Sequence, residues 1–477
     1  MGGDDDFPLI MELRRRVVVL LLCLMLLLSA PVAYACGLAL DSDKWEVVEA
    51  GDALFEGVPS IETSRRYSHL TEVAAVELER LKGVNVTTAD VYAHKGYAYV
   101  GTHRGLCSNE GVRVFDLSDP SNPVEVAVFA NDIPGTWQEK VIVKNVSTPY
   151  FKGDLAAVSV QRCDRVAAQH GGTVLYDVTD PTNPQFLSFW KTPTEVLTGT
   201  HELYLTTQGN RVLLLTADIY ADYYTQGEQG DFSIVDVTDP SHPTTIFNWD
   251  PREIIGHEYN GYNFVDEEGT PRIAFAHSVI TDVNGKYAYV SYWDLGTIIF
   301  DISNPEEAQV VGRTSFERHV QGAAHSAALA RGGNILIETR EVFNPDPADP
   351  EYERGWGYTR IYDISDKSNP VLISDFRTTN SMTQIVDGER QPGTFTVHDP
   401  KVRGNTLYLS HYADGIRVVD ISNPAQPVEV ASYVPDRSNI WGVFVDRNYI
   451  LGSDMGTGLK ILQRVLGHSQ SHGKGPQ

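Results

Sequence analysis

Positive charge is scarce in this chain of 477 residues. Its 38 lysines and arginines stand against 63 aspartates and glutamates, which gives a formal net charge of -25 at pH 7. Binding of nucleic acid or of an anionic membrane surface draws much of its strength from lysine and arginine, so the composition argues against both as partners. The same surplus of carboxylates leaves room for the binding of cations.

The sequence also lacks the short motifs that mark several classes of catalytic site. It has no glycine-rich phosphate loop after a strand, no nucleophile elbow and no Cys-x-x-Cys pair. Ser278 and Ser326 directly follow histidines, but neighbouring side chains of a strand point to opposite faces, so we do not expect a Ser–His dyad.

An apolar run long enough to span a membrane comfortably is missing from the N-terminus. The run at 17–28 is short, follows the basic segment 11–16 and precedes a small-x-small site that ends at Ala35. This order predicts a signal peptide over residues 1–35, with Met11 as an alternative start. We therefore expect the protein outside the cell or in the cell envelope.

Cysteine is rare, with four residues in all. Cleavage after residue 35 would make Cys36 the first mature residue, as in a bacterial lipoprotein. Plain secretion is favoured over lipidation because Tyr34 is bulky where a small or β-branched residue is usual, and a lipid at Cys36 would be the only link to a membrane. Cys107 and Cys163 occupy equivalent places in neighbouring repeats and could form a disulfide, with two separate buried thiols as the alternative.

What the chain has in abundance is one repeated phrase, a β-branched and aromatic run that ends in Asp-x-Ser/Thr and a turn. Its six aspartates are Asp116, Asp177, Asp236, Asp301, Asp363 and Asp420. A truncated seventh copy lies at 458–463. A strand-like segment precedes each of the seven copies, and a shorter one follows six of them, so the last repeat lacks its fourth strand.

The missing strand is expected from the N-terminal side of the chain. The segment 75–81 resembles the fourth strand at 427–433, with 44–49 as an alternative, and a strand that completes the last repeat closes a ring. We predict an all-β fold over residues 75–464: a seven-bladed β-propeller with four-stranded antiparallel blades. Residues 36–74 are then an extension or tether, and 465–477 a polar, disordered tail.

The repeated aspartates have a structural interpretation. Asp and Ser/Thr side chains hydrogen-bond the backbone that follows them, and proline fixes φ in a turn. We interpret the phrase as the turn of each blade, in preference to a metal or catalytic site.

The phrase, as at 112–120 and 415–424, together with the Ala-Tyr-Val strand upstream, resembles the LVIVD-repeat family of exported bacterial and archaeal proteins. The resemblance covers about 75–464. It implies a propeller at the cell surface or outside the cell, and it brings no agreed activity and no catalytic residues.

Four histidines stand at one equivalent place in consecutive repeats, at the start of the first strand: His201, His277, His325 and His398. The first strand of a propeller blade lines the central channel, so we expect these side chains to converge at the channel mouth, with His257 as an addition. Neutral imidazoles suit a transition metal such as Zn or Cu. The alternative is a wet channel in which each histidine only satisfies nearby backbone groups.

Two long insertions, at 218–231 and 340–358, lie on the same face as the histidines. We expect a small-molecule or protein ligand to bind on this face, which predicts a function in binding with a His-lined central site. The alternative function is a metal-dependent enzyme, a hydrolase, lyase or oxidase, that uses the histidine cluster.

Overall fold

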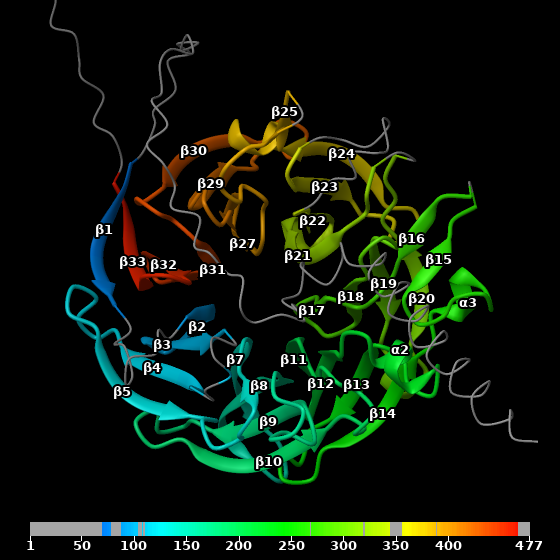
Figure 1. Cartoon of the computed structure of the whole chain (residues 1–477). Coiled ribbons are helices and arrows are strands. Elements are labelled where there is room, and N and C mark those ends of the chain that lie inside the picture. The colour runs from blue at the N-terminus through cyan, green and yellow to red at the C-terminus, as the bar shows by residue number, and fades with distance from the viewer. Residues whose placement is uncertain are drawn as a thin grey trace, which may run out of the picture.

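The computed structural model describes residues 69–77, 87–103, 107, 110–267, 269–317, 320–343, 355–387 and 389–465. These residues form seven antiparallel blade sheets arranged radially around a central axis (Figure 1). Six of the sheets have four strands, and the second has a short fifth strand, β6 (Thr136–Trp137), which pairs with the end of its second strand. The predicted seven-bladed propeller is confirmed. Among the described helices, none is long and apolar enough to cross a membrane. The expected signal peptide, Cys36 and all but the first residue of the expected tail lie outside the described residues.

Each blade runs from an innermost strand beside the axis to an outermost strand at the rim. The innermost strands, in blade order, are β2 (Thr88–His94), β7 (Val141–Ser147), β11 (Glu202–Gln208), β17 (Ser278–Thr281), β21 (Ala324–Ala330), β27 (Pro400–Arg403) and β31 (Ile440–Asp446). The second strands are β3 (Tyr97–Thr102), β8 (Lys152–Arg162), β12 (Arg211–Ala217), β18 (Tyr287–Ser291), β22 (Ile335–Arg340), β28 (Thr406–Ser410) and β32 (Tyr449–Asp454). The third strands are β4 (Val112–Asp116), β9 (Gly172–Asp177), β13 (Phe232–Asp236), β19 (Thr297–Asp301), β23 (Thr359–Asp363), β29 (Ile416–Asp420) and β33 (Gly458–Val465). The outermost strands of the first six blades are β5 (Val124–Phe129), β10 (Gln185–Lys191), β14 (Thr244–Trp249), β20 (Gln309–Arg313), β24 (Val371–Phe376) and β30 (Val428–Tyr433).

The seventh blade takes its outermost strand, β1 (His69–Val76), from the N-terminal side of the chain, as predicted. β1 pairs antiparallel with β33, so the first and last described strands lie side by side (Figure 1). Half-buried Val73 and Val76 pack against the apolar cluster that joins the first and seventh blades. A closed ring leaves no blade without a neighbour.

The closing strand lies earlier in the chain than the expected segment 75–81. It begins at His69, so residues 69–74 belong to the propeller and not to the extension assigned to 36–74. The register shifts between Glu72 and Ala74, and this bulge interrupts the alternation that marks a strand in the sequence.

The turn interpretation of the repeated aspartates is confirmed. In each of the six copies the aspartate Oδ1 accepts a hydrogen bond from the backbone N–H two residues later, at 2.7–2.9 Å. Each bond closes the turn between the third and fourth strands of a blade.

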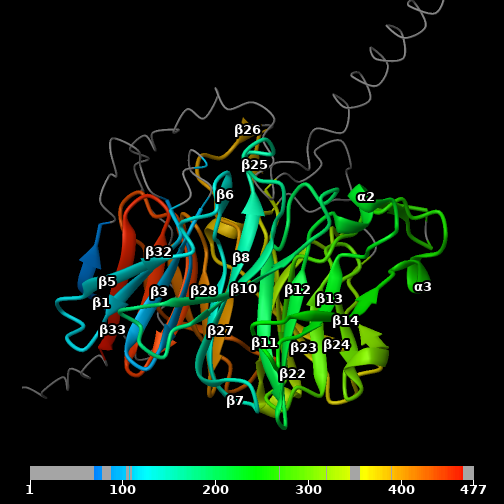
Figure 2. The same ribbon diagram turned by 90° about the horizontal axis from the view of Figure 1, so that it is seen from below.

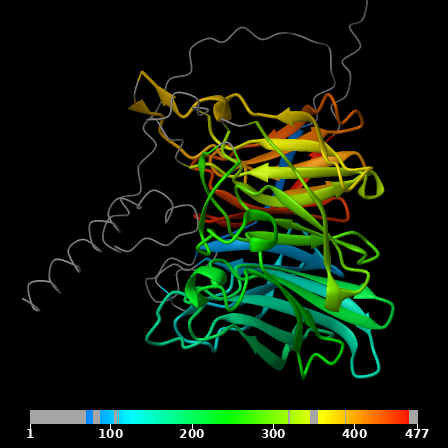
Figure 3. The ribbon, with the colours of Figure 1, turned by 90° about the vertical axis from the view of Figure 1, so that its right-hand side faces the viewer.

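The insertions gather on the opposite face, which we call the insertion face (Figures 2 and 3). This face carries the helices α2 (Ala221–Thr225) and α3 (Arg252–Ile255), the ribbon β15 (Asn263–Val265)–β16 (Pro271–Ile273) and the ribbon β25 (Ile385–Val386)–β26 (Glu389–Arg390). The innermost strands begin here, because the strands of a blade alternate in direction. The face with the turns between first and second strands is called the hairpin face.

Candidate metal centre

Bulges at the start of the innermost strands bring two consecutive residues to the axis. In β21 the register shifts between Ala324 and Ser326, and His325 is the extra residue. In β31 the shift falls between Ile440 and Gly442, and Trp441 is the extra residue. A bulge sets two residues of one strand opposite a single partner and re-aims their side chains.

The same arrangement recurs in other blades. The backbone N–H of His201 donates to the carbonyl of Ala217, which also pairs with Glu202. His277 and Ser278 share Ser291 in the same way. The result is two layers around the axis. The upper layer, nearer the insertion face, is a ring of side chains each in contact with the next: Glu139, His201, His277, His325, His398 and Trp441. The lower layer comprises Asp90, Lys140, Glu202, Ser278, Ser326 and Asp399.

The four predicted histidines converge in the upper layer. Their rings follow one another around the axis, with centroid distances of 4.4 Å between His201 and His277, 3.8 Å between His277 and His325, and 4.5 Å between His325 and His398. The Nε2 atoms of His201 and His277 lie 3.0 Å apart. None of the four residues is more than 5% exposed, so they form a buried cluster and not an open mouth.

Four further side chains, His103, Trp137, Glu341 and Trp441, complete the wall of this cavity. The ring of His103 lies 4.7 Å from that of Trp137 and 5.1 Å from that of Trp441. The space within this cavity that the centre of a water molecule can occupy is about 10 Å³. That is room for one water molecule or one ion.

One end of the cluster is a buried ion pair. The carboxylate of Glu139 lies 3.0 Å from His201 Nδ1 and accepts hydrogen bonds from Gln161 Nε2 at 2.8 Å and Trp441 Nε1 at 3.1 Å. Burial alone would raise the pKa of Glu139, but the attraction of His201 holds that pKa at about 2. Burial lowers the pKa of His201, and Glu139 outweighs this effect and raises it. The Nδ1 atom of His201 is therefore held in an ion pair with Glu139.

The other histidines are neutral. Burial lowers the pKa of His277 and His325 well below the ordinary value, and repulsion between neighbouring imidazoles lowers it further. Burial also holds the pKa of His398 at about 3 despite the attraction of Glu139. Neutral imidazoles offer a lone pair to a metal ion at physiological pH.

His277, His325 and Glu341 form a group that could hold a metal ion. Each offers one ligand atom, and these atoms all lie within 4.8 Å of one another. His325 Nε2 and Glu341 Oε2 are 3.5 Å apart. A tetrahedral Zn²⁺ with bonds of 2.0–2.1 Å sets its ligand atoms about 3.3 Å apart, so small shifts would complete the geometry.

Some polar atoms of this group are buried without hydrogen-bond partners among the described residues. They are His277 Nδ1 and Glu341 Oε2, and Nδ1 of the neighbouring His398 is likewise unpaired. The other oxygen of Glu341 accepts a hydrogen bond from the hydroxyl of Tyr412 at 2.6 Å. Burial raises the pKa of Glu341 well above its ordinary value even though this bond lowers it. An unpaired buried polar atom costs about 1–3 kcal/mol, and a cation would remove this cost.

The structure also places the other residues singled out in the sequence: His257, the two cysteines and Ser326. His257 is exposed in the turn after α3 and does not line the cavity, because the chain leaves the axis in this insertion. Cys107 and Cys163 form a disulfide with a Cα–Cα distance of 5.7 Å, which links the first and second blades. Ser326 does not face away from His325 as expected: its Oγ lies 2.8 Å from His325 Nδ1, because the bulge breaks the alternation.

Sequence reasoning missed Glu341 and His103. Glu341 directly follows β22, inside the insertion at 340–358. His103 directly follows β3. The signal that could have found both was their position at the end of a second strand, on the face where the histidines begin.

Comparison with known proteins agrees with the repeat. The LVIVD repeat family matches residues 87–130, 220–250, 278–314, 355–378 and 396–434, which fall on the first, third, fourth, fifth and sixth blades. No curated protein matches the sequence. Among solved structures, the crystal structure of the computationally designed Ika8 protein is similar at a TM-score of 0.45 and 11% identity, over 83% of this chain and 99% of that chain.

Proposed function

The chain is a member of the LVIVD repeat family with a buried histidine cluster on its axis, and we propose that it binds one divalent transition metal ion, Zn or Cu, there. His277, His325 and Glu341 are the proposed ligands. The ring of His398 lies beside this group, 4.5 Å from that of His325. The observation that carries the proposal is this buried group of convergent ligand atoms, which come from the fourth and fifth blades.

The chemistry of the donors supports a transition metal over Ca²⁺ or Mg²⁺. Two imidazoles and one carboxylate form the type of donor set found at Zn sites, whereas Ca²⁺ and Mg²⁺ take oxygen ligands. Burial raises the pKa of Glu341, and a carboxyl group coordinates an ion in its ionised form. Binding should therefore release a proton and strengthen as the pH rises.

The alternative of a cluster that only satisfies its own polar groups fits less well. Glu139 and Gln161 do satisfy His201 Nδ1, and Trp441 donates to Glu139. In contrast, His277, His398 and Glu341 retain unpartnered atoms within the described part of the chain. Native proteins rarely leave such atoms buried and unpaired.

A metal-dependent hydrolase, lyase or oxidase is the second candidate function. One observation favours this function. The polar lower layer lies directly beneath the histidines and borders a large cavity. Ser326 lines that cavity and also contacts His325. A substrate in the cavity would be separated from the metal site by this layer alone.

The protein is proposed to work outside the cell or in the cell envelope. The disulfide between Cys107 and Cys163 supports this location, because disulfides persist in oxidising compartments and are rare in the cytosol. A ligand or partner on the insertion face remains part of this proposal.

Metal analysis of protein purified without chelator tests the metal site. We expect close to one equivalent of Zn or Cu, lost in His277→Ala/His325→Ala and reduced in Glu341→Gln. Free Zn²⁺ at about 100 times its Kd should raise the free energy of unfolding by about 2.7 kcal/mol in the wild type and not in the double variant.

His257→Ala is the matched control, because it removes an exposed histidine outside the cavity. Its metal content should equal that of the wild type. Absence of bound metal after incubation with Zn²⁺ and with Cu²⁺, or equal metal in the folded double variant, would refute the proposal.

A further inference from the structure

A second cavity, of about 730 Å³, occupies the channel beneath the histidines. The innermost strands line it, and the turns that contain Asn284 and Gly333 border it on the hairpin face. Its volume falls within the range of about 300–1,000 Å³ that is usual for small-molecule sites. Nothing in the proposed metal site accounts for it.

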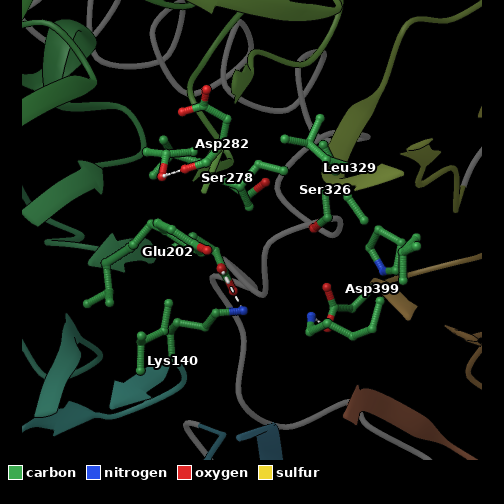
Figure 4. A pocket seen from close by; sticks show the side chains of 18 of the residues that line it. Lys140, Glu202, Ser278, Asp282, Ser326, Leu329 and Asp399 are labelled. Atoms are coloured by element: carbon green, nitrogen blue, oxygen red, sulfur yellow. Dashed lines mark hydrogen bonds and ion pairs between the residues drawn. The ribbon is translucent and has the colours of Figure 1, made fainter. Parts of the chain in front are cut away.

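The closed end of this cavity, next to the histidines, is formed by the polar lower layer (Figure 4), and we call this end its floor. Lys140 Nζ lies 2.7 Å from Asp90 Oδ2 and 3.0 Å from Glu202 Oε2. Asp90 Oδ1 and Ser278 Oγ are buried without a hydrogen-bond partner in the described part of the chain, and both residues are less than 5% exposed. The floor therefore retains acceptors that no described protein group satisfies.

The charge of the lining favours a cation. Four carboxylates line the cavity, those of Asp90, Glu202, Asp282 and Asp399, against the two ammonium groups of Lys140 and Lys401. Lys140 is held between Asp90 and Glu202, and Lys401 pairs with Asp399. An anion would have to displace these carboxylates, whereas a cation would add to the network.

The walls between the floor and the hairpin face are largely apolar. They are formed by Ile142, Leu203, Ile280, Leu329, Val402 and Phe444. A site with an apolar wall and a few convergent polar groups fits a ligand with a hydrocarbon body and one charged head.

We propose that this cavity binds a small organic amine. Its ammonium group lies at the floor among Asp90, Glu202 and Ser278, and its hydrocarbon body lies along the apolar wall. The proposal does not rest on the metal site, because every residue that it uses belongs to the lower layer or the channel wall.

Calorimetric titration of the full chain with hexylamine, hexanol and hexanoate tests this proposal. The three probes share a hydrocarbon body and differ in the charge of the head. We expect hexylamine to bind at least ten times more tightly than either of the others. Glu202→Gln and Asp90→Asn should each weaken hexylamine binding by at least ten times and leave hexanol binding unchanged.

Glu258→Gln is the charge-matched control, because Glu258 is exposed in the insertion after α3. It should bind hexylamine as the wild type does. Thermal unfolding identifies any variant that fails to fold, and the other lower-layer variant then carries the test. Tighter binding of hexanoate, or hexylamine binding that survives both folded variants, would overturn the proposal.

The His277→Ala/His325→Ala variant separates this proposal from that of the metal. Hexylamine should bind it as tightly as it binds the wild type. If the amine is lost with the metal and not with Glu202→Gln, it coordinates the metal, and the cavity assignment is wrong.

Discussion

Asp218 is a single carboxyl group that we expect to affect the stability of the protein. It is fully buried after β12 and accepts hydrogen bonds from the hydroxyls of Thr200 at 2.6 Å and Thr216 at 2.9 Å. Thr200 directly precedes His201, so this network holds the start of β11 in place. Burial raises the pKa of Asp218 to about 6, although the hydrogen bonds oppose it.

Asp218→Asn should stabilise the protein increasingly as the pH rises. Because the pKa of the Asp218 carboxyl group is higher in the folded protein, its protonation stabilises the folded state fully at a pH below the unfolded pKa near 3.8. This stabilisation is lost as the pH rises through about 6. The wild type thus loses stability between pH 5 and pH 8 where the Asn variant does not, by roughly 1–2 kcal/mol. Urea unfolding at both pH values measures the difference.

Asp301→Asn is a suitable comparison. In the wild type the carboxyl group of Asp301 has a lowered pKa, chiefly because of its hydrogen bond with Ser303. The effect of this substitution should not grow between pH 5 and pH 8. An Asp218→Asn variant whose advantage stays constant over this range would show that Asp218 is ionised in the folded protein throughout.

The turn between the third and fourth strands is the local element that every full repeat shares. In the fourth blade the N–H of Ser303 donates to Asp301 Oδ1 at 2.9 Å. Asp301→Ala should lower the free energy of unfolding by about 1 kcal/mol, because it removes this bond. Chemical denaturation measures the loss, and the metal content should be unchanged because the turn lies on the hairpin face.

Asp301→Asn supplies the control at this turn, since the amide oxygen can still accept the bond. It should retain most of the stability that the Ala variant loses. Equal losses in the two variants would mean that the charge, and not the hydrogen bond, stabilises the turn.

The repeated strand and turn could be predicted because each leaves a local pattern in the sequence. The alignment of these patterns was enough to place His201, His277, His325 and His398 at one level of the channel. The bulges could not be predicted, since one extra residue in a strand leaves no local pattern. This is why Ser326 was expected to face away from His325 and why the closing strand was expected six residues late. Glu341 could not be predicted, because it lies in an insertion that the other repeats lack.

The whole ring depends on one strand from the beginning of the propeller. β1 pairs along β33 from His69↔Val465 to Val76↔Leu459 and supplies the outer edge of the seventh blade. Half-buried Leu70 packs against the cluster between the sixth and seventh blades, and Val73 and Val76 pack against the one between the seventh and first. A chain that begins at residue 78 should therefore lose on the order of 3 kcal/mol of stability, the apolar burial of these side chains.

Urea unfolding and light scattering of two truncated chains test this closure. The chain that begins at residue 69 should match the full protein, whereas the one that begins at 78 exposes the edge of β33 and should also self-associate. A synthetic peptide of residues 69–77 should bind the shorter chain, restore its stability and reduce the scattering, because it supplies the missing strand. Equal stability of the two truncated chains would show that the seventh blade holds without β1, and that the ring is closed by the contacts between the blade sheets alone.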